Sequence, residues 1–114
     1  MVRWLGKNGK GARQPFDYDI NVTCAKNSMR VSVSAERYEG CFNKTQKMRV
    51  GYDKENLRIY FVPSEEGFRV FRQVRGYRPY FQFSRSYIRG DAKCFLGFHN
   101  LEHDDIGYYI EGVR

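Results

Sequence analysis

Two histidines and a glutamate stand at the spacing of a known zinc-binding pattern. Residues 99–103 read H-x-x-E-H, the pattern found in one class of zinc metalloprotease. That chemistry needs both histidines on one face of a helix, the glutamate as general base and a further ligand downstream. This segment instead falls between two expected strands, in sequence that is poor for a helix. We expect a solvated loop and no metal site, the alternative being weak metal binding by His99, His103 and Asp105.

Arginines recur at every third position between residues 69 and 78, with Phe71, Tyr77 and Tyr80 interleaved. Guanidinium groups pair with phosphate or carboxylate, and aromatic rings can stack on bases. Side chains alternate between the faces of a strand, so at most two or three of these arginines share a surface. Arginines from a second short helix are expected to join them. The predicted binding residues are Arg30, Arg37, Arg69, Arg72, Arg75, Arg78, Arg85 and Arg89.

Positive charge dominates the chain, with 20 lysines and arginines against 13 acidic residues and a net charge of +7. Residues 1–17 hold several glycines and show no apolar period, which predicts a flexible basic N-terminal arm. Its cations are Arg3, Lys7, Lys10 and Arg13. This balance favours a polyanionic or acidic partner, although a basic composition also simply keeps a small protein soluble.

DNA and an acidic protein surface remain two open choices of partner. Arginine recognises phosphate and carboxylate with the same fork of donors, so the sequence does not separate them. The first choice predicts a small regulatory DNA-binding protein of bacterial or phage type. The second predicts an interaction protein or inhibitor from a phage or mobile element.

Catalytic and redox signatures are weak. Cys24, Cys41 and Cys94 are too widely spaced for a disulfide framework or a zinc site, so we expect three reduced cysteines, with Cys24 and Cys94 buried on strands. We find no Ser-His-Asp arrangement and no glycine-rich phosphate loop between a strand and a helix. The expectation is a protein that is not an enzyme and has no cofactor.

Nothing in the sequence approaches the roughly 20 consecutive apolar residues that a membrane span needs. The first residues are too polar for a secretory signal peptide. We therefore expect a cytoplasmic protein without a membrane partner.

An internal repeat organises most of the chain. Residues 31–40 and 81–90 each place an alternating apolar strand before a serine, a short charged segment and a glycine. In the first copy, apolar alternation predicts strands at residues 20–24, 29–33, 48–52 and 57–61. Ser34 is expected to cap a short helix that ends near Gly40.

The second copy predicts the same order of elements. Strands are expected at residues 68–70 and 81–83, and Ser84 is expected to cap a short helix that stops near Gly90. Residues 94–98 and 106–110 are expected to form a closing hairpin. The prediction is a mainly β domain at residues 18–114, with two β-β-α-β-β halves at 20–62 and 68–112. Packed about a pseudo-two-fold axis, the halves are expected to close into a small barrel with short helices only.

Two such halves resemble the swapped-hairpin barrel of AbrB, MazE and MraZ-type proteins. The segment from Met29 to Arg37 is similar to that family's strand–helix pattern in its arginine, its alternation and its helix start. It departs from the pattern where Met29 replaces a glycine and Ser34 a proline, and the second copy departs further. The resemblance implies DNA binding in transcription regulation, through basic residues near the strand–helix junction. Because both halves lie in one chain, it also implies a monomer.

Overall fold

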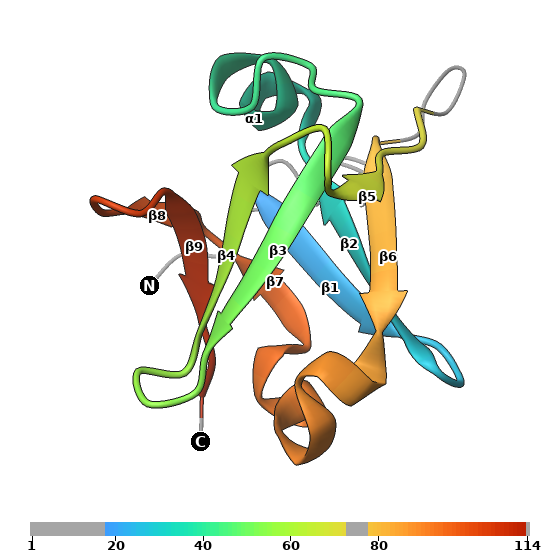
Figure 1. The fold of residues 1–114 in the computed structure, drawn as a ribbon, viewed down its shortest axis with the longest axis vertical. Helices are drawn as coiled ribbons and strands as arrows, with labels where there is room; N and C mark the ends of the chain where they lie inside the picture. Colours follow the sequence, from blue (N-terminus) through green and yellow to red (C-terminus); the bar gives the residue numbers. More distant parts are fainter. Residues whose placement is uncertain (1–17, 73–77, 114) are drawn as a thin grey trace, which may run out of the picture.

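Nine strands in two antiparallel sheets form the framework of the described chain (Figure 1). The structure, a computed structural model, describes residues 18–72 and 78–113. Sheet A has the order β6 (Tyr80–Ser84), β2 (Ser28–Val33), β1 (Ile20–Cys24), β7 (Gly97–His99). Sheet B has the order β5 (Phe68–Arg69), β3 (Lys47–Asp53), β4 (Arg58–Pro63), β9 (Tyr108–Glu111), β8 (Glu102–His103). The predicted mainly β fold is confirmed.

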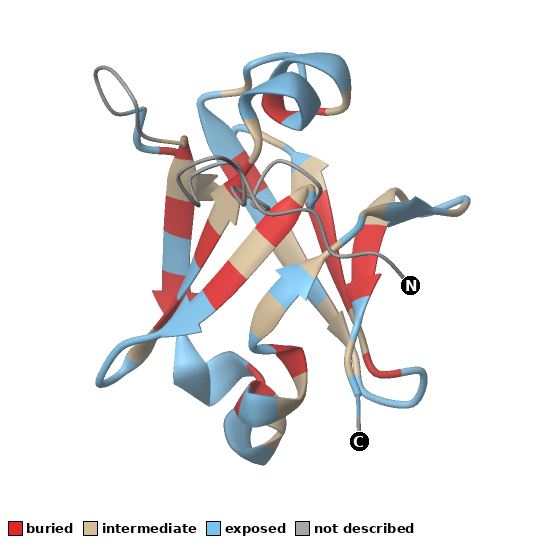
Figure 2. Ribbon diagram, turned by 180° about the vertical axis from the view of Figure 1, so that it is seen from behind, coloured by how far each residue is buried: buried red, intermediate tan, exposed pale blue. Residues whose placement is uncertain are grey.

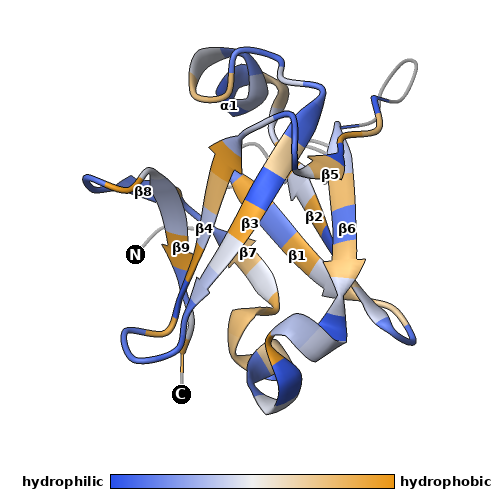
Figure 3. Ribbon diagram, in the orientation of Figure 1, coloured by the Kyte–Doolittle hydropathy of each residue, from blue (hydrophilic) through white to orange (hydrophobic). Residues whose placement is uncertain are grey.

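Alternating side chains build one core between the two sheets. In β2, Met29, Val31 and Val33 are buried while the residues between them are not, as the period of a strand requires (Figure 2). The hydropathy of the strands changes with the same alternation (Figure 3). Phe61 of β4 and Phe81 of β6 meet across the core, their ring centroids 5.6 Å apart. The core is therefore shared by both halves of the sequence.

The first half follows the sequence prediction closely. Its helix, α1 (Ala35–Gly40), begins after Ser34, whose hydroxyl accepts a hydrogen bond from the Arg37 N–H at 3.2 Å. Tyr38 anchors the helix, because its ring is buried and its hydroxyl donates to the Thr45 carbonyl. All four predicted strands of this half are present, within one or two residues of their predicted ends.

The second half differs from its prediction. Ser84 does begin a 3-10 turn, η3 (Arg85–Tyr87), but a second one, η4 (Arg89–Phe95), continues past Gly90. Ala92 and Phe95 bury the inner side of η4, so residues 94 and 95 are not in a strand. The predicted closing hairpin is wrong, because β7 pairs with β1 and β9 pairs with β4.

Neither sheet closes on itself, so the structure does not have the predicted closed barrel. At one junction the sheets are joined only by an isolated bridge between Phe71 and Tyr80. At the other, the edge strands β7 and β8 form no pair among the described residues. The strands β5, β7 and β8 have only two or three residues each, too few to complete a ladder.

A glycine allows β5 to lie against β3. A Cβ atom at Gly67 would come within 2.2 Å of the Met48 backbone carbon, closer than real Cβ contacts. This approach pairs Phe68 with Met48 and Arg69 with Lys47. It thereby sets the position of the surface described next.

None of the helices in the described ranges is long and apolar enough to cross a membrane.

Candidate nucleic-acid interface

Four side chains stack in a row where β2, β6 and the chain after β5 meet. The Arg30 guanidinium lies over the Tyr80 ring at 4.0 Å, and Tyr80 stacks with Phe71 at 5.2 Å and 25°. The Arg69 guanidinium lies over the Phe71 ring at 5.4 Å. We call these four residues, Arg30, Tyr80, Phe71 and Arg69, the cationic column. It has a positive charge at each end and two rings between.

Backbone pairing sets the order of the column. β2 and β6 are antiparallel neighbours, and Arg30 and Gln82 are partners in register, which places Arg30 beside Tyr80 on the outer face of sheet A. Phe71 and Tyr80 exchange two backbone hydrogen bonds, of 2.7 and 3.0 Å. The two rings are therefore held side by side by the main chain as well as by their own contact.

Beside the column lies a hollow of about 670 Å³. Its lining includes three cations, two rings of the column and no acidic residue: Gln46, Lys47, Arg69, Val70, Phe71, Arg72 and Tyr80. Lys47 faces this side because Met48, the next residue of β3, points into the core. Burial raises the pKa of Tyr38 in α1, and the positive charge of Arg72 partly opposes that shift.

The cations of this surface have no carboxylate partner among the described residues. The ion pairs there are Arg37–Asp19, Lys44–Glu39, Arg58–Asp104 and Arg58–Glu111. None includes Arg30, Lys47, Arg69 or Arg72. Cations gathered without counter-charges raise the local positive potential and attract anions.

The remaining predicted arginines lie elsewhere. Arg37 donates to the Asp19 carboxylate at 2.8 Å. Arg85 donates to the Lys26 carbonyl. It follows Ser84, the last residue of β6, which lies roughly 14 Å from Tyr80 at about 3.4 Å per residue. Arg89 is further along, in η4, and Figure 1 shows these turns at the end of the molecule opposite to α1. Arg78 is half-buried beside β6.

Two sets of predicted cations fall outside the described residues. They are Arg75 and the arm residues Arg3, Lys7, Lys10 and Arg13. Of the eight arginines predicted to bind, the structure thus brings Arg30, Arg69 and Arg72 together, close to the two or three that strand geometry allowed.

The zinc-like pattern does not form a zinc site. His99 lies in β7 of sheet A, while Glu102 and His103 form β8 of sheet B, so the pattern is not on one helix face. The His99 Nε2–H donates to the Phe95 carbonyl at 2.7 Å, and the His103 ring packs on Tyr108 at 4.7 Å. In residues 18–72 and 78–113, no three His, Cys, Asp or Glu side chains lie close enough to hold a metal.

The three cysteines are free thiols. Cys24 is exposed at the end of β1, so its predicted burial is wrong, and Cys94 is half-buried in η4. Cys41 lies beside α1, where the Arg37 guanidinium donates to its sulfur at 3.9 Å. A hydrogen bond with Cys41 is the main cause that raises the pKa of Tyr108.

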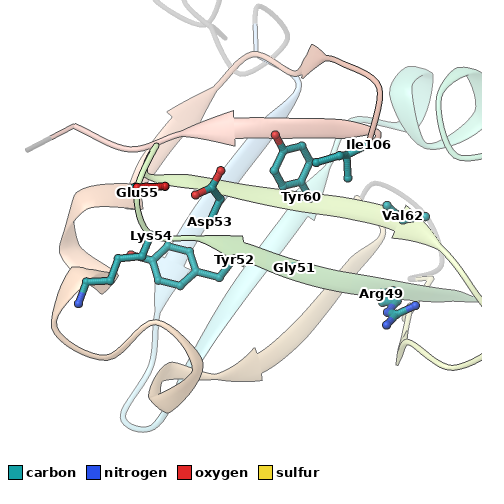
Figure 4. A pocket seen from close by; sticks show the side chains of 9 residues that line it. All are labelled: Arg49, Gly51, Tyr52, Asp53, Lys54, Glu55, Tyr60, Val62 and Ile106. Carbon is teal, nitrogen blue, oxygen red and sulfur yellow. The ribbon is translucent and has the colours of Figure 1, made fainter.

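A second hollow, of about 1120 Å³, lies on the outer face of sheet B (Figure 4). Gly51 leaves its middle open, since a central strand residue without a side chain exposes its neighbours. Tyr60 and Ile106 lie close together beside it, with Arg49 and Val62 at one end. Ile106 is 63% exposed. This hollow has an apolar middle and charged ends.

One arginine holds the loop beside this second hollow. The Arg58 guanidinium pairs with Asp104 at 3.3 Å and with Glu111 at 3.2 Å, and it lies over the Tyr109 ring at 4.3 Å. The Tyr60 hydroxyl donates to Asp104 at 2.6 Å. That bond is the main cause that raises the pKa of Tyr60 and lowers the pKa of Asp104. Hydrogen bonds to Tyr60 and then Glu111 raise the pKa of Arg58.

Sequence reasoning missed Lys47 and Gln46 as members of the candidate interface. The alternation of β3 does assign Lys47 to the outer face. Nothing local in the sequence indicates that β5 pairs with β3, and that pairing brings Lys47 next to Arg69. Phe71 and Tyr80 were identified as interleaved aromatics, but not as stacked partners.

Comparison of this chain with protein-family models, with curated proteins and with solved structures finds no match. The resemblance to AbrB, MazE and MraZ-type proteins therefore stays a prediction from the sequence.

Proposed function

We propose that this protein binds DNA through the cationic column and the hollow beside it. The observation that carries this proposal is the column itself, in which two guanidinium groups lie over stacked rings and have no carboxylate partner among the described residues. Lys47 and Arg72 add two more cations next to Arg69. Phosphate groups are the anions that such a cluster binds most readily in a polyanionic partner.

Pre-organisation supports the same function. Long side chains lose rotamer entropy when they bind, and Arg30 has already lost part of it by packing on Tyr80 at 4.0 Å. The paired backbones of Phe71 and Tyr80 fix the rings to which both arginines attach. A phosphate that approaches this surface meets donors that are already oriented.

We further infer that residues 20–62 and 68–112 are equivalent halves related by a pseudo-two-fold axis. In this alignment β1, β2, β3 and β4 of the first half correspond to β5, β6, β7 and β9 of the second. The pairs β2–β6 and β4–β9 then each join two corresponding strands, and the pair β1–β7 corresponds to the pair β5–β3. This order suits an internally duplicated relative of AbrB-type regulators, a cytoplasmic monomer from a bacterium or phage. Light scattering of the full chain tests the monomer; a stable dimer would contradict it.

The direct test of DNA binding is fluorescence anisotropy with labelled oligonucleotides. We expect binding at about 50 mM salt that weakens steeply by about 200 mM, in proportion to the phosphates neutralised. Lys93→Ala is the matched control, because Lys93 is an exposed cation in η4, away from the column. Absence of binding at low salt would overturn the proposal.

Docking on an acidic protein is the second candidate, and the hollow on sheet B favours it. An apolar middle with a charged rim is the usual anatomy of a protein interface. Ile106 is exposed there, and Arg49 offers a cation without an ion pair among the described residues. A pull-down with and without nuclease separates the candidates. A protein partner that survives nuclease and is lost with Ile106→Asp favours docking.

A further inference from the structure

At one end of the cationic column, the face of the Phe71 ring that points away from Tyr80 is only loosely covered. Arg30 packs on Tyr80 at 4.0 Å, which is direct contact, but Arg69 lies 5.4 Å from the Phe71 centroid. Phe71 is 40% exposed. An exposed guanidinium at that distance makes a looser contact than Arg30 does and can move aside, which leaves an aromatic face that a second flat ring can cover.

Cations surround that ring face. Lys47, Arg69 and Arg72 line the hollow together with Phe71, and no acidic residue does. A flat ring that carries phosphates on both sides is a nucleotide within a strand. In a duplex, both faces of an inner base are covered by its neighbours and must be unstacked at a cost, whereas an unpaired base is free to stack on a protein ring.

We propose that the cationic column binds single-stranded DNA, with one unpaired base stacked on Phe71 and the flanking phosphates on Lys47, Arg69 and Arg72. This rests on the proposed function and narrows its ligand to unpaired strands. The bridge to Tyr80 holds the Phe71 backbone in place, so the platform exists before the strand arrives.

The chain contains an internal comparison for this platform. Tyr18 and Phe98 stack at 5.1 Å and 29°, nearly the geometry of Phe71 and Tyr80, and Phe98 is 51% exposed. No guanidinium lies over either ring among the described residues. A stacked pair without cations should not hold a strand, so Phe98→Leu is the matched control for Phe71→Leu.

The test uses the full chain and three labelled probes in anisotropy titrations at one salt concentration. The probes are a 12-nucleotide oligothymidine, an abasic strand with the same number of phosphates, and a 12-base-pair hairpin duplex. We expect oligothymidine to bind tighter than the abasic strand by at least roughly fivefold, the lower end for one stacked base. It should also bind tighter than the duplex. Phe71→Leu should remove the difference between oligothymidine and the abasic strand, and Phe98→Leu should keep it.

Each other outcome overturns the inference, and one of them also overturns the proposed function. Equal binding of oligothymidine and the abasic strand would show contacts to phosphates alone. Tighter binding of the duplex would exclude the unpaired strand. In both cases DNA binding itself would stand. If none of the probes binds, the proposed function fails too. The comparison of probes on the unaltered protein holds even if a variant does not fold.

Discussion

Arg30 and Arg58 make the same contact on different sheets and differ in what else they touch. Arg30 lies 4.0 Å above Tyr80 on sheet A, and Arg58 lies 4.3 Å above Tyr109 on sheet B. Arg58 also pairs with two carboxylates, whereas Arg30 pairs with none in the described part of the chain. The ring contact alone therefore does not reveal the role of an arginine.

The difference lies in how the positive charge is used. Asp104 and Glu111 neutralise Arg58, which ties β4 to β9 and to the loop that follows β8. A charge compensated in this way stabilises the fold and attracts little else. The charge of Arg30 stays open to solvent and so to an anionic partner. In the function that we propose, Arg58 stabilises the fold and Arg30 binds DNA.

Removing the charges of the column should have the largest effect. For Arg30→Ala combined with Arg69→Ala, we expect DNA affinity to fall by roughly 100-fold or more, since each charge-assisted hydrogen bond contributes about 1.5–3 kcal/mol. Both side chains are exposed, so the unfolding free energy should change by less than about 1 kcal/mol. Anisotropy and urea unfolding measure the two effects. A fall in affinity of less than about threefold would remove the column from the interface.

Gly67 tests how the column is positioned. In Gly67→Ala, the new methyl group would press on the Met48 backbone, and a rigid main chain cannot move aside cheaply. We expect a loss of about 2 kcal/mol or more in unfolding free energy, together with weaker DNA binding, because β5 would shift away from β3. Gly40→Ala is the control, since a Cβ there meets nothing within 4 Å. Equal stability of the two variants would contradict this account.

Removing Arg58 should lower stability and leave DNA binding unchanged, the opposite of what we expect for the column arginines. In Arg58→Ala, the carboxylates of Asp104 and Glu111 lose their cation and Tyr109 loses its cover. We expect a lower Tm than for Arg30→Ala, with DNA affinity unchanged. Circular dichroism melting and anisotropy on the same samples check this. If Arg58→Ala weakens DNA binding as much as Arg30→Ala, the two arginines do not differ in role.

The smallest expected effect is a pH dependence of stability. The hydrogen bond from Tyr60 lowers the pKa of Asp104 in the folded protein. A carboxyl whose pKa is lower folded than unfolded stabilises the fold above the unfolded value of about 3.9, and this contribution is lost as pH falls through the folded pKa. Part of the drop in Tm below about pH 4 should therefore be missing in Asp104→Asn. An identical drop in both proteins would show that Asp104 is not responsible.

Local patterns sufficed for the first half of the fold. Apolar alternation at residues 20–33 and 48–61, with a serine before a charged segment, predicted four strands and α1, because each depends on its own residues. Residues 94–98 alternate in the same way, yet η4 takes up the first two of them. Phe95 enters the core from a 3-10 turn, and Cys94 accepts a hydrogen bond from Val113. Whether residues 94 and 95 form a 3-10 turn or a strand therefore depends on tertiary contacts, not on the alternation of apolar residues.

The candidate site was predictable only in part. Strand geometry limited how many arginines share a surface, and the interleaved rings were visible in the sequence. Their stacking depends on the bridge between Phe71 and Tyr80, and the place of Lys47 depends on the pairing of β3 with β5. The neutralisation of Arg58 depends on Asp104, 46 positions away. Contacts over such distances leave no mark in a local pattern.

The most direct test of DNA binding by the column is the salt dependence of oligothymidine affinity. The logarithm of the affinity, plotted against the logarithm of salt concentration, has a slope of about −0.7 per phosphate neutralised on a single strand. For Arg30→Ala combined with Arg69→Ala, the account predicts a slope less negative by about 1.4, and for Lys93→Ala an unchanged slope. An unchanged slope in the double variant would contradict the claim that these two arginines neutralise phosphates.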